Sequence, residues 1–161
     1  MKTHSLFFLI VTLLFVQSPA TLTAAPSKPE KDVDPQSLFS EGTALLLDLK
    51  FAEAEEKLRA AAEADSNLAE VHNNLAYVLR KQGKFEEALE HYNRAISLNA
   101  ELPEPYMYRG VLHVQMDSLG AAHADLEILK ALNPELAEEL AFVIEQGQEK
   151  EPEQFFGVVR G

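Results

Sequence analysis

The sequence predicts an all-α solenoid of three helix-turn-helix repeats followed by a C-terminal capping helix. Segments 35–68, 69–102 and 103–136 align at a period of 34 residues without an insertion. Small residues recur at repeat position 8 (Gly42, Ala76, Gly110) and at position 20 (Ala54, Ala88, Ala122). Such a period is typical of stacked supersecondary units, which present an extended surface suited to recognition.

Each repeat divides into two amphipathic helices with a turn between them. In the second repeat, one helical face carries Val71, Leu75, Val78 and Leu79, and a second carries Ala88, Leu89, Tyr92, Ala95 and Ile96. Gly83 is expected to end the first helix, since glycine suits the left-handed position after a helix. Ala76 and Ala88 are small enough to let the two helices of the repeat approach closely.

The pattern is carried by residues spread over all three repeats. They are Leu38, Gly42, Leu45, Phe51, Ala54, Leu58 and Ala61; then Leu75, Ala76, Gly83, Phe85, Ala88, Tyr92 and Ala95; then Tyr106, Gly110, Ala122, Leu126, Leu132 and Pro134. Over residues 35–136 the chain therefore resembles the tetratricopeptide repeat (TPR) family, which implies a right-handed superhelical stack. Ser66 and Ala100 stand where the family usually has proline, so the helices before them are expected to run on further.

Apolar residues continue at helical spacing after Pro134, at Leu136, Leu140, Val143 and Ile144. They predict a helix over 137–147 that covers the exposed core of the last repeat. Residues 148–161 are expected to form a disordered tail with an apolar tip, Phe155, Phe156, Val158 and Val159. Two hypotheses remain open for the tip: docking on an apolar surface, and a frayed terminus with incidental aromatics.

The first residues are typical of a secretory signal peptide. Lys2 precedes an apolar run from Leu6 to Val16, and small residues follow it. We expect residues 1–20 to be removed by cleavage after Ala20, with Ala24 as the alternative site, and residues 21–34 to form a flexible linker. An uncleaved membrane anchor is disfavoured because the run falls short of the roughly 20 residues that span a bilayer. The prediction is a periplasmic or secreted protein without membrane insertion after cleavage.

Composition and motifs argue against catalysis, metal binding and nucleic-acid binding. The formal charge of −12 disfavours nucleic acid as a partner, and the absence of cysteine excludes thiolate metal sites and a cysteine nucleophile. The five histidines do not pair at the i, i+4 spacing of a helical metal site, and no Gly-x-Ser-x-Gly motif occurs. His72 and His113 occupy apolar repeat positions and are expected to have a core or boundary role and not to act as ligands. We therefore predict no enzyme activity, cofactor or metal.

The TPR resemblance implies a concave groove lined by the first helix of each repeat. The predicted groove residues are Phe39, Thr43, Asn73, Asn74, Tyr77, Arg80, Met107, Tyr108 and Val111. We expect Asn73, Tyr77 and Arg80 of the middle repeat to be solvent-exposed, with Asn73 and Asn74 suited to a peptide backbone and Tyr77 offering a rigid contact face. Arg80 either pairs with a carboxylate of the ligand or only compensates the helix dipole, as Lys81 is expected to do.

Some TPR proteins grip a C-terminal carboxylate with basic and amide residues. Only Asn74 matches that set here, because Phe39, Glu104 and Tyr108 stand at the expected basic positions. An apolar groove with a polar centre suits an amphipathic helix or an extended apolar segment instead. The leading hypothesis is a non-enzymatic adaptor that binds a protein or peptide. The alternative is a structural subunit that forms homo-oligomers by placing its tail in the groove of another copy.

One buried ion pair is also expected. Arg109 lies on the first helix of the third repeat, and Asp125 lies on the second. We predict a structural pair between them and not a ligand contact.

Overall fold

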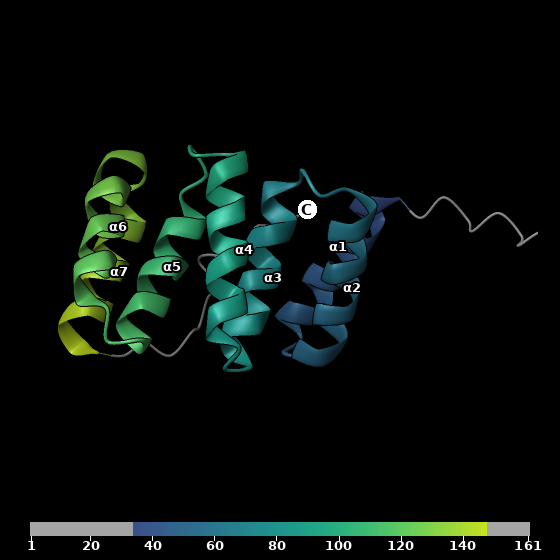
Figure 1. The fold of residues 1–161 in the computed structure, drawn as a ribbon, viewed down its shortest axis with the longest axis horizontal. Coiled ribbons are helices and arrows are strands. Elements are labelled where there is room, and N and C mark those ends of the chain that lie inside the picture. Colours follow the sequence, from purple (N-terminus) through teal and green to yellow (C-terminus); the bar gives the residue numbers. More distant parts are fainter. Residues whose placement is uncertain (1–33, 148–161) are drawn as a thin grey trace, which may run out of the picture. The chain divides into compact units, whose positions relative to one another are not determined.

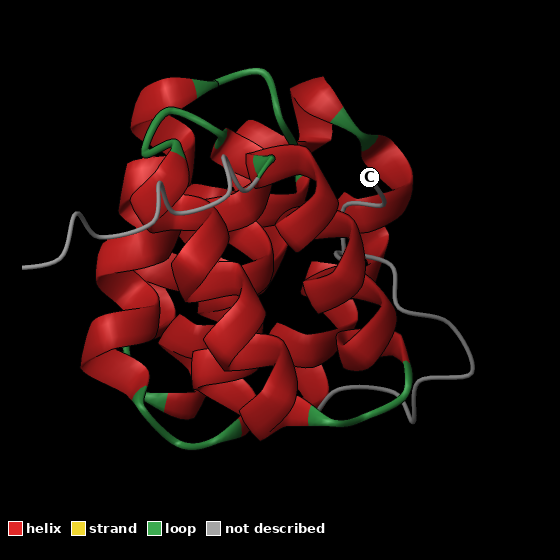
Figure 2. Cartoon of the chain, turned by 90° about the vertical axis from the view of Figure 1, so that its right-hand side faces the viewer, coloured by secondary structure: helices red, strands yellow, loops and turns green. Residues whose placement is uncertain are grey.

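The computed structural model describes residues 34–147. These residues form seven α-helices and no strand: α1 (Pro35–Leu47), α2 (Phe51–Ala64), α3 (Ala69–Lys81), α4 (Phe85–Leu98), α5 (Glu104–Gln115), α6 (Leu119–Leu132) and α7 (Pro134–Gln146). Figure 1 shows them side by side from the α1/α2 pair to the α6/α7 end, and Figure 2 shows short loops joining them. The predicted all-α solenoid is confirmed.

The second helix of every repeat ends at the same repeat position, at Ala64, Leu98 and Leu132. The expectation that α2 and α4 run on past this point is wrong. Asp65, Asn99 and Asn133 follow these helices in an extended backbone conformation. Each side chain accepts a hydrogen bond from the backbone N–H two residues ahead. This local turn ends the helix without the proline that Ser66 and Ala100 replace.

The capping helix begins earlier than expected. α7 starts at Pro134, inside the third repeat, and not at residue 137. The Asn133 side chain caps it by accepting hydrogen bonds from the N–H groups of Glu135 and Leu136, both at 3.1 Å. Proline at the first helical position costs nothing because its missing N–H would have no partner inside the helix. Gly147 ends α7 in the left-handed region, a conformation that suits glycine.

The first helices of the repeats form an inner row that continues into α7. α1 packs against α3, α3 against α5, and α5 against α7. Close approach in this stack depends on glycine. A Cβ atom at Gly42 would lie 2.8 Å from Cγ of Leu58 on α2, and one at Gly110 would lie 2.5 Å from Cδ2 of Leu140 on α7. Repeat position 8 is therefore small for two reasons: contact within the repeat in the first, and contact with the capping helix in the third.

Several sequence predictions fall outside the described residues. The signal peptide, the linker up to residue 33 and the tail at 148–161 belong to this group. Asp34, the last residue of the expected linker, caps α1 by accepting a hydrogen bond from the N–H of Gln36. Among residues 34–147, no helix combines the length and apolar character needed to cross a membrane.

Candidate functional site

Polar side chains connect α1 to α3 in the predicted groove. The Asn74 amide nitrogen donates a hydrogen bond to Thr43 Oγ1 at 3.1 Å, and the Asn73 amide nitrogen donates to Asn74 Oδ1 at 3.1 Å. The side chains of both asparagines are completely buried. Buried amides normally require such partners, because a lost hydrogen bond costs about 1–3 kcal/mol. This arrangement fixes the orientation of both amides.

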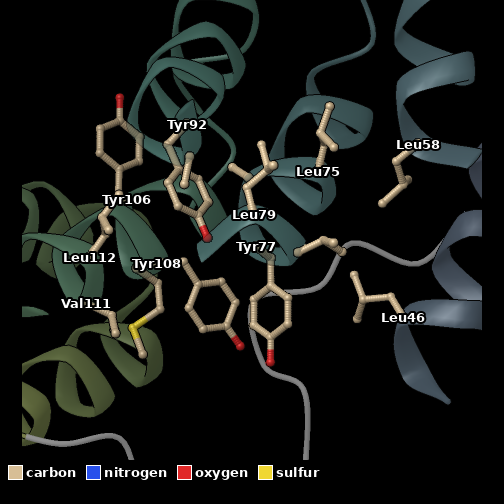
Figure 3. Packing of buried hydrophobic residues seen from close by; sticks show 14 of the residues in the cluster. Leu46, Leu58, Leu75, Tyr77, Leu79, Tyr92, Tyr106, Tyr108, Val111 and Leu112 are labelled. Carbon is tan, nitrogen blue, oxygen red and sulfur yellow. The ribbon is translucent and has the colours of Figure 1, made fainter. Parts of the chain in front are cut away.

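An aromatic and cationic cluster connects α3 to α5. The rings of Tyr77 and Tyr108 meet edge to face with their centroids 4.8 Å apart. Figure 3 shows the two rings next to each other with their hydroxyl groups turned to the same side. The Arg80 guanidinium lies 5.2 Å from both ring centroids, and its Nη1 donates to Gln115 Oε1 at 3.3 Å. Arg80 therefore does more than compensate the helix dipole: it ties α3 to α5 through cation–π contacts.

The remaining predicted groove residues are apolar members of the main hydrophobic cluster. They are Phe39 on α1 and Met107 and Val111 on α5, each no more than 5% exposed. Apolar residues therefore lie on both outer repeats, and the polar residues Asn73, Asn74 and Arg80 lie on the middle one.

The expectation of solvent exposure is wrong. All nine predicted groove residues are buried in the full-length chain, and Arg80 is only 2% exposed. The burial of the four groove residues on α3 follows in part from the position of this helix, which packs against α1, α2, α4 and α5. The helical period identified the face of each helix, but exposure depends on how closely neighbouring elements approach. Their assignment as a binding groove stays a prediction.

The predicted ion pair of the third repeat is confirmed. Arg109 Nη2 lies 2.6 Å from Asp125 Oδ1, and Arg109 Nε donates to the other carboxylate oxygen at 3.1 Å. The first repeat holds a pair that the prediction missed, Lys57 with Glu41 at 2.8 Å. Both pairs join repeat positions 7 and 23, with the charges exchanged. The sequence carried this signal, because Glu41 and Arg109 both replace the usual apolar residue.

The second repeat has a histidine, His91, at repeat position 23, and it pairs with His72 of the preceding helix. The Nδ1 atoms of His72 on α3 and His91 on α4 lie 2.9 Å apart, and the two rings are stacked. His72 Nε2 lies 3.2 Å from the Ser66 carbonyl oxygen, which can only accept a hydrogen bond. Neutral His72 therefore carries its proton on Nε2, and His91 must donate from Nδ1. Burial lowers the pKa of both, and the nearby His72 further helps to lower that of His91 to about 4.

His72 is buried, as its apolar repeat position predicted. The contact of His91 with His72 could not be inferred from helical spacing, because the two residues lie on different helices. Within the part of the chain that the structure describes, no group of three or more histidine, aspartate or glutamate side chains is arranged to hold a metal ion.

Burial also raises the pKa of Glu104, with Glu70 adding to the effect. Glu104 stands at one of the positions where a basic residue is expected in TPR proteins that bind a C-terminal carboxylate.

Comparison with known proteins supports one family. A family model described as tetratricopeptide repeat matches residues 69–101. Among curated proteins, none matches. The first TPR of Spaghetti (RPAP3), solved with the HSP90 peptide SRMEEVD, is 25% identical with a TM-score of 0.65, over 72% of this chain and 94% of that one.

Two further solved structures share the fold. PcrH, in complex with the chaperone-binding region of PopD, is 19% identical with a TM-score of 0.64, over 70% of this chain and 89% of that one. The type III secretion chaperone SycD from Yersinia enterocolitica, in complex with a peptide of the translocator YopD, is 16% identical with a TM-score of 0.64, over 70% of this chain and 90% of that one. The second repeat therefore matches the tetratricopeptide repeat model, and the described residues share the fold of solved tetratricopeptide repeat domains.

Proposed function

We propose that this chain is a non-enzymatic interaction module that binds a polypeptide segment through the predicted groove of α1, α3 and α5. One observation carries the proposal: two sets of side-chain contacts start from α3. The first joins Asn73 and Asn74 to Thr43 on α1, and the second joins Tyr77 and Arg80 to Tyr108 on α5. Together they place amide, aromatic and cationic groups in fixed positions across three helices. Recognition requires this kind of fixed geometry, since binding costs less when the surface is already ordered.

The structural neighbours support the same class of function. The Spaghetti, PcrH and SycD structures each contain a bound peptide or a binding region of another protein. The apolar side chains of the outer repeats favour an apolar or amphipathic segment as ligand over an acidic C-terminus. The signal-peptide pattern of residues 1–20 supports export, so we place this binding activity in the periplasm or outside the cell.

A displayed library of random peptides tests the proposal without knowledge of the natural partner. Peptides selected on the native chain should lose about tenfold or more in affinity for Arg80→Gln, which removes the guanidinium between Tyr77 and Tyr108. Arg94→Gln is the matched control, because Arg94 lies exposed on α4 and bonds to the loop before α3. Circular dichroism establishes that both variants fold. The proposal fails if no peptide is selected, or if the selected peptides bind both variants equally.

The alternative, a self-assembling structural subunit, makes a different prediction. Its apparent mass in analytical ultracentrifugation would rise with protein concentration, whereas an adaptor would remain at one mass in the absence of its ligand. The apolar residues at 155–159 are the feature of the sequence that favours this alternative.

A further inference from the structure

We propose that residues 155–159 of the same chain occupy the predicted groove and compete with an external ligand. The inference rests on the proposed function, because it assigns an intramolecular occupant to that groove. It also explains why a strongly acidic chain carries Phe155, Phe156, Val158 and Val159 close together in sequence. Burial of such side chains is worth about 25 cal/mol for each Å² removed from water.

The first argument is reach. α7 ends at Gln146, and α7 packs against α5, which packs against α3. Packed helices lie about 8–10 Å apart, so the step from α7 to α3 covers about 20 Å. The segment between Gly147 and Phe155 can span about 26 Å when extended, at about 3.3 Å per residue. The apolar residues can therefore reach α3 without any change in the helical stack.

The second argument is chemical complementarity. The predicted groove combines the aromatic rings of Tyr77 and Tyr108 with the apolar side chains of Phe39, Met107 and Val111. Aromatic pairs contribute about 0.5–1.5 kcal/mol beyond their buried area. The connecting segment is acidic overall, with Glu149, Glu151 and Glu153 against the single Lys150, and the last turn of α3 carries Arg80 and Lys81. Apolar groups would meet an apolar and aromatic surface while acidic groups meet a basic one.

The third argument is the tether. A short flexible connection gives a bound segment an effective concentration on the order of millimolar. Even a weak contact is then largely occupied within one chain, whereas the same contact between two copies would need a comparable protein concentration. Tethering therefore favours the chain's own segment over that of a second copy. An external ligand would bind with its affinity reduced by the fraction of chains that are already occupied.

Photo-crosslinking in the full-length chain tests the location. Phe156 is replaced by p-benzoylphenylalanine, and equal amounts of ordinary and ¹⁵N-labelled protein are mixed before irradiation. We expect cross-links from residue 156 to peptides of α3 or α5 in which both halves carry the same isotope. The matched control places the same group at Leu119, an exposed residue of α6, and should give no cross-link to α3 or α5. Cross-links that combine the two isotopes would assign the groove to a second copy and overturn the proposal, as would the absence of cross-links to the inner helices.

Competition tests the consequence. The probe is a fluorescent peptide with the sequence of residues 149–161, measured against full-length chains by anisotropy. The variant with Phe155→Ala and Phe156→Ala should bind the probe about tenfold more tightly than the native chain. Substituting Gln148 and Gln154 by alanine is the matched control and should leave the affinity unchanged. Equal affinity in the native chain and the phenylalanine variant, or no binding to either, would overturn the proposal.

These outcomes separate the two proposals. If the library-selected peptides depend on Arg80 but the cross-links fail, only the intramolecular occupant is contradicted and the proposed function stands. If Arg80→Gln changes the affinity of neither the selected peptides nor the probe, the assignment of the groove as a binding site is contradicted.

Discussion

Gly110 on α5 lies directly against Leu140 on α7. A Cβ atom at Gly110 would meet Leu140 Cδ2 at 2.5 Å and Cδ1 at 2.8 Å, distances that real side chains do not tolerate. The capping helix therefore packs on the third repeat so closely that an added methyl group at position 110 would force the Leu140 side chain to move. Leu140 is completely buried, so the end of the stack is closed by this packing.

Gly110→Ala should lower the free energy of unfolding by about 1–3 kcal/mol, because the buried Leu140 side chain, or α7 with it, must shift to accommodate the methyl group. Gly120→Ala is the control, since no atom lies within 4 Å of its added Cβ, and alanine there should be neutral or stabilising. Urea denaturation of both variants measures the difference. If the two substitutions have the same effect, the contact with Leu140 does not limit residue size at position 110.

Asp125→Asn should destabilise the chain by about 2–4 kcal/mol. The carboxylate is 2% exposed and receives two hydrogen bonds from Arg109, so its neutralisation leaves the guanidinium without its charge partner. Glu127→Gln provides the comparison on the same helix, because the Glu127–Lys130 pair is exposed and should contribute little. Thermal melting at low and high salt distinguishes the two. A small effect of Asp125→Asn would mean that Asn93, which accepts from Arg109 Nη1, suffices as a partner.

Stability should fall as the pH drops below the ordinary histidine pKa. The folded state lowers the pKa of His72 and of His91, so both imidazoles favour their neutral form when the chain is folded. This contribution is complete above the unfolded pKa of about 6.5 and is lost as the pH falls through the folded pKa, about 4 for His91. Double protonation would also place two N–H groups against each other across the 2.9 Å contact.

The variant His91→Gln should lose less stability than the native chain between about pH 7.5 and about pH 5. Its amide can still donate to His72 Nδ1 but does not titrate. His123→Gln on the exposed side of α6 is the control and should follow the native curve. Chemical denaturation at each pH measures the effect. Parallel curves for all three proteins would exclude the histidine pair as the cause.

Tyr92→Phe should be neutral or slightly stabilising. The Tyr92 side chain is completely buried, and its hydroxyl makes no well-aligned hydrogen bond among residues 34–147, although the Arg80 guanidinium lies near it. Removing a buried group of this kind avoids a desolvation cost of about 1–3 kcal/mol. Tyr106→Phe makes the same chemical change where the hydroxyl donates to the Ala100 carbonyl at 3.2 Å, and it should destabilise by about 1 kcal/mol. Differential scanning calorimetry compares them, and a larger loss for Tyr92→Phe would contradict the assignment.

The sequence by itself determined the number, order and class of the elements. Repeat period, apolar spacing and small residues act locally, so the first helix of the second repeat could be read from Val71, Leu75 and Leu79 and its end from Gly83. Asp125 could be paired with Arg109 because both lie in one repeat, where the two helices have a fixed relation. The same reasoning would have found Glu41 with Lys57.

The tertiary structure decided what depends on the distance between elements. Burial of Asn73 and Arg80 follows from how closely the neighbours of α3 approach, and the contact of Gly110 with Leu140 depends on where α7 docks. The His72–His91 pair depends on the orientation of two rings on different helices. These relations join positions that no period connects, and side-chain packing in the assembled stack sets them.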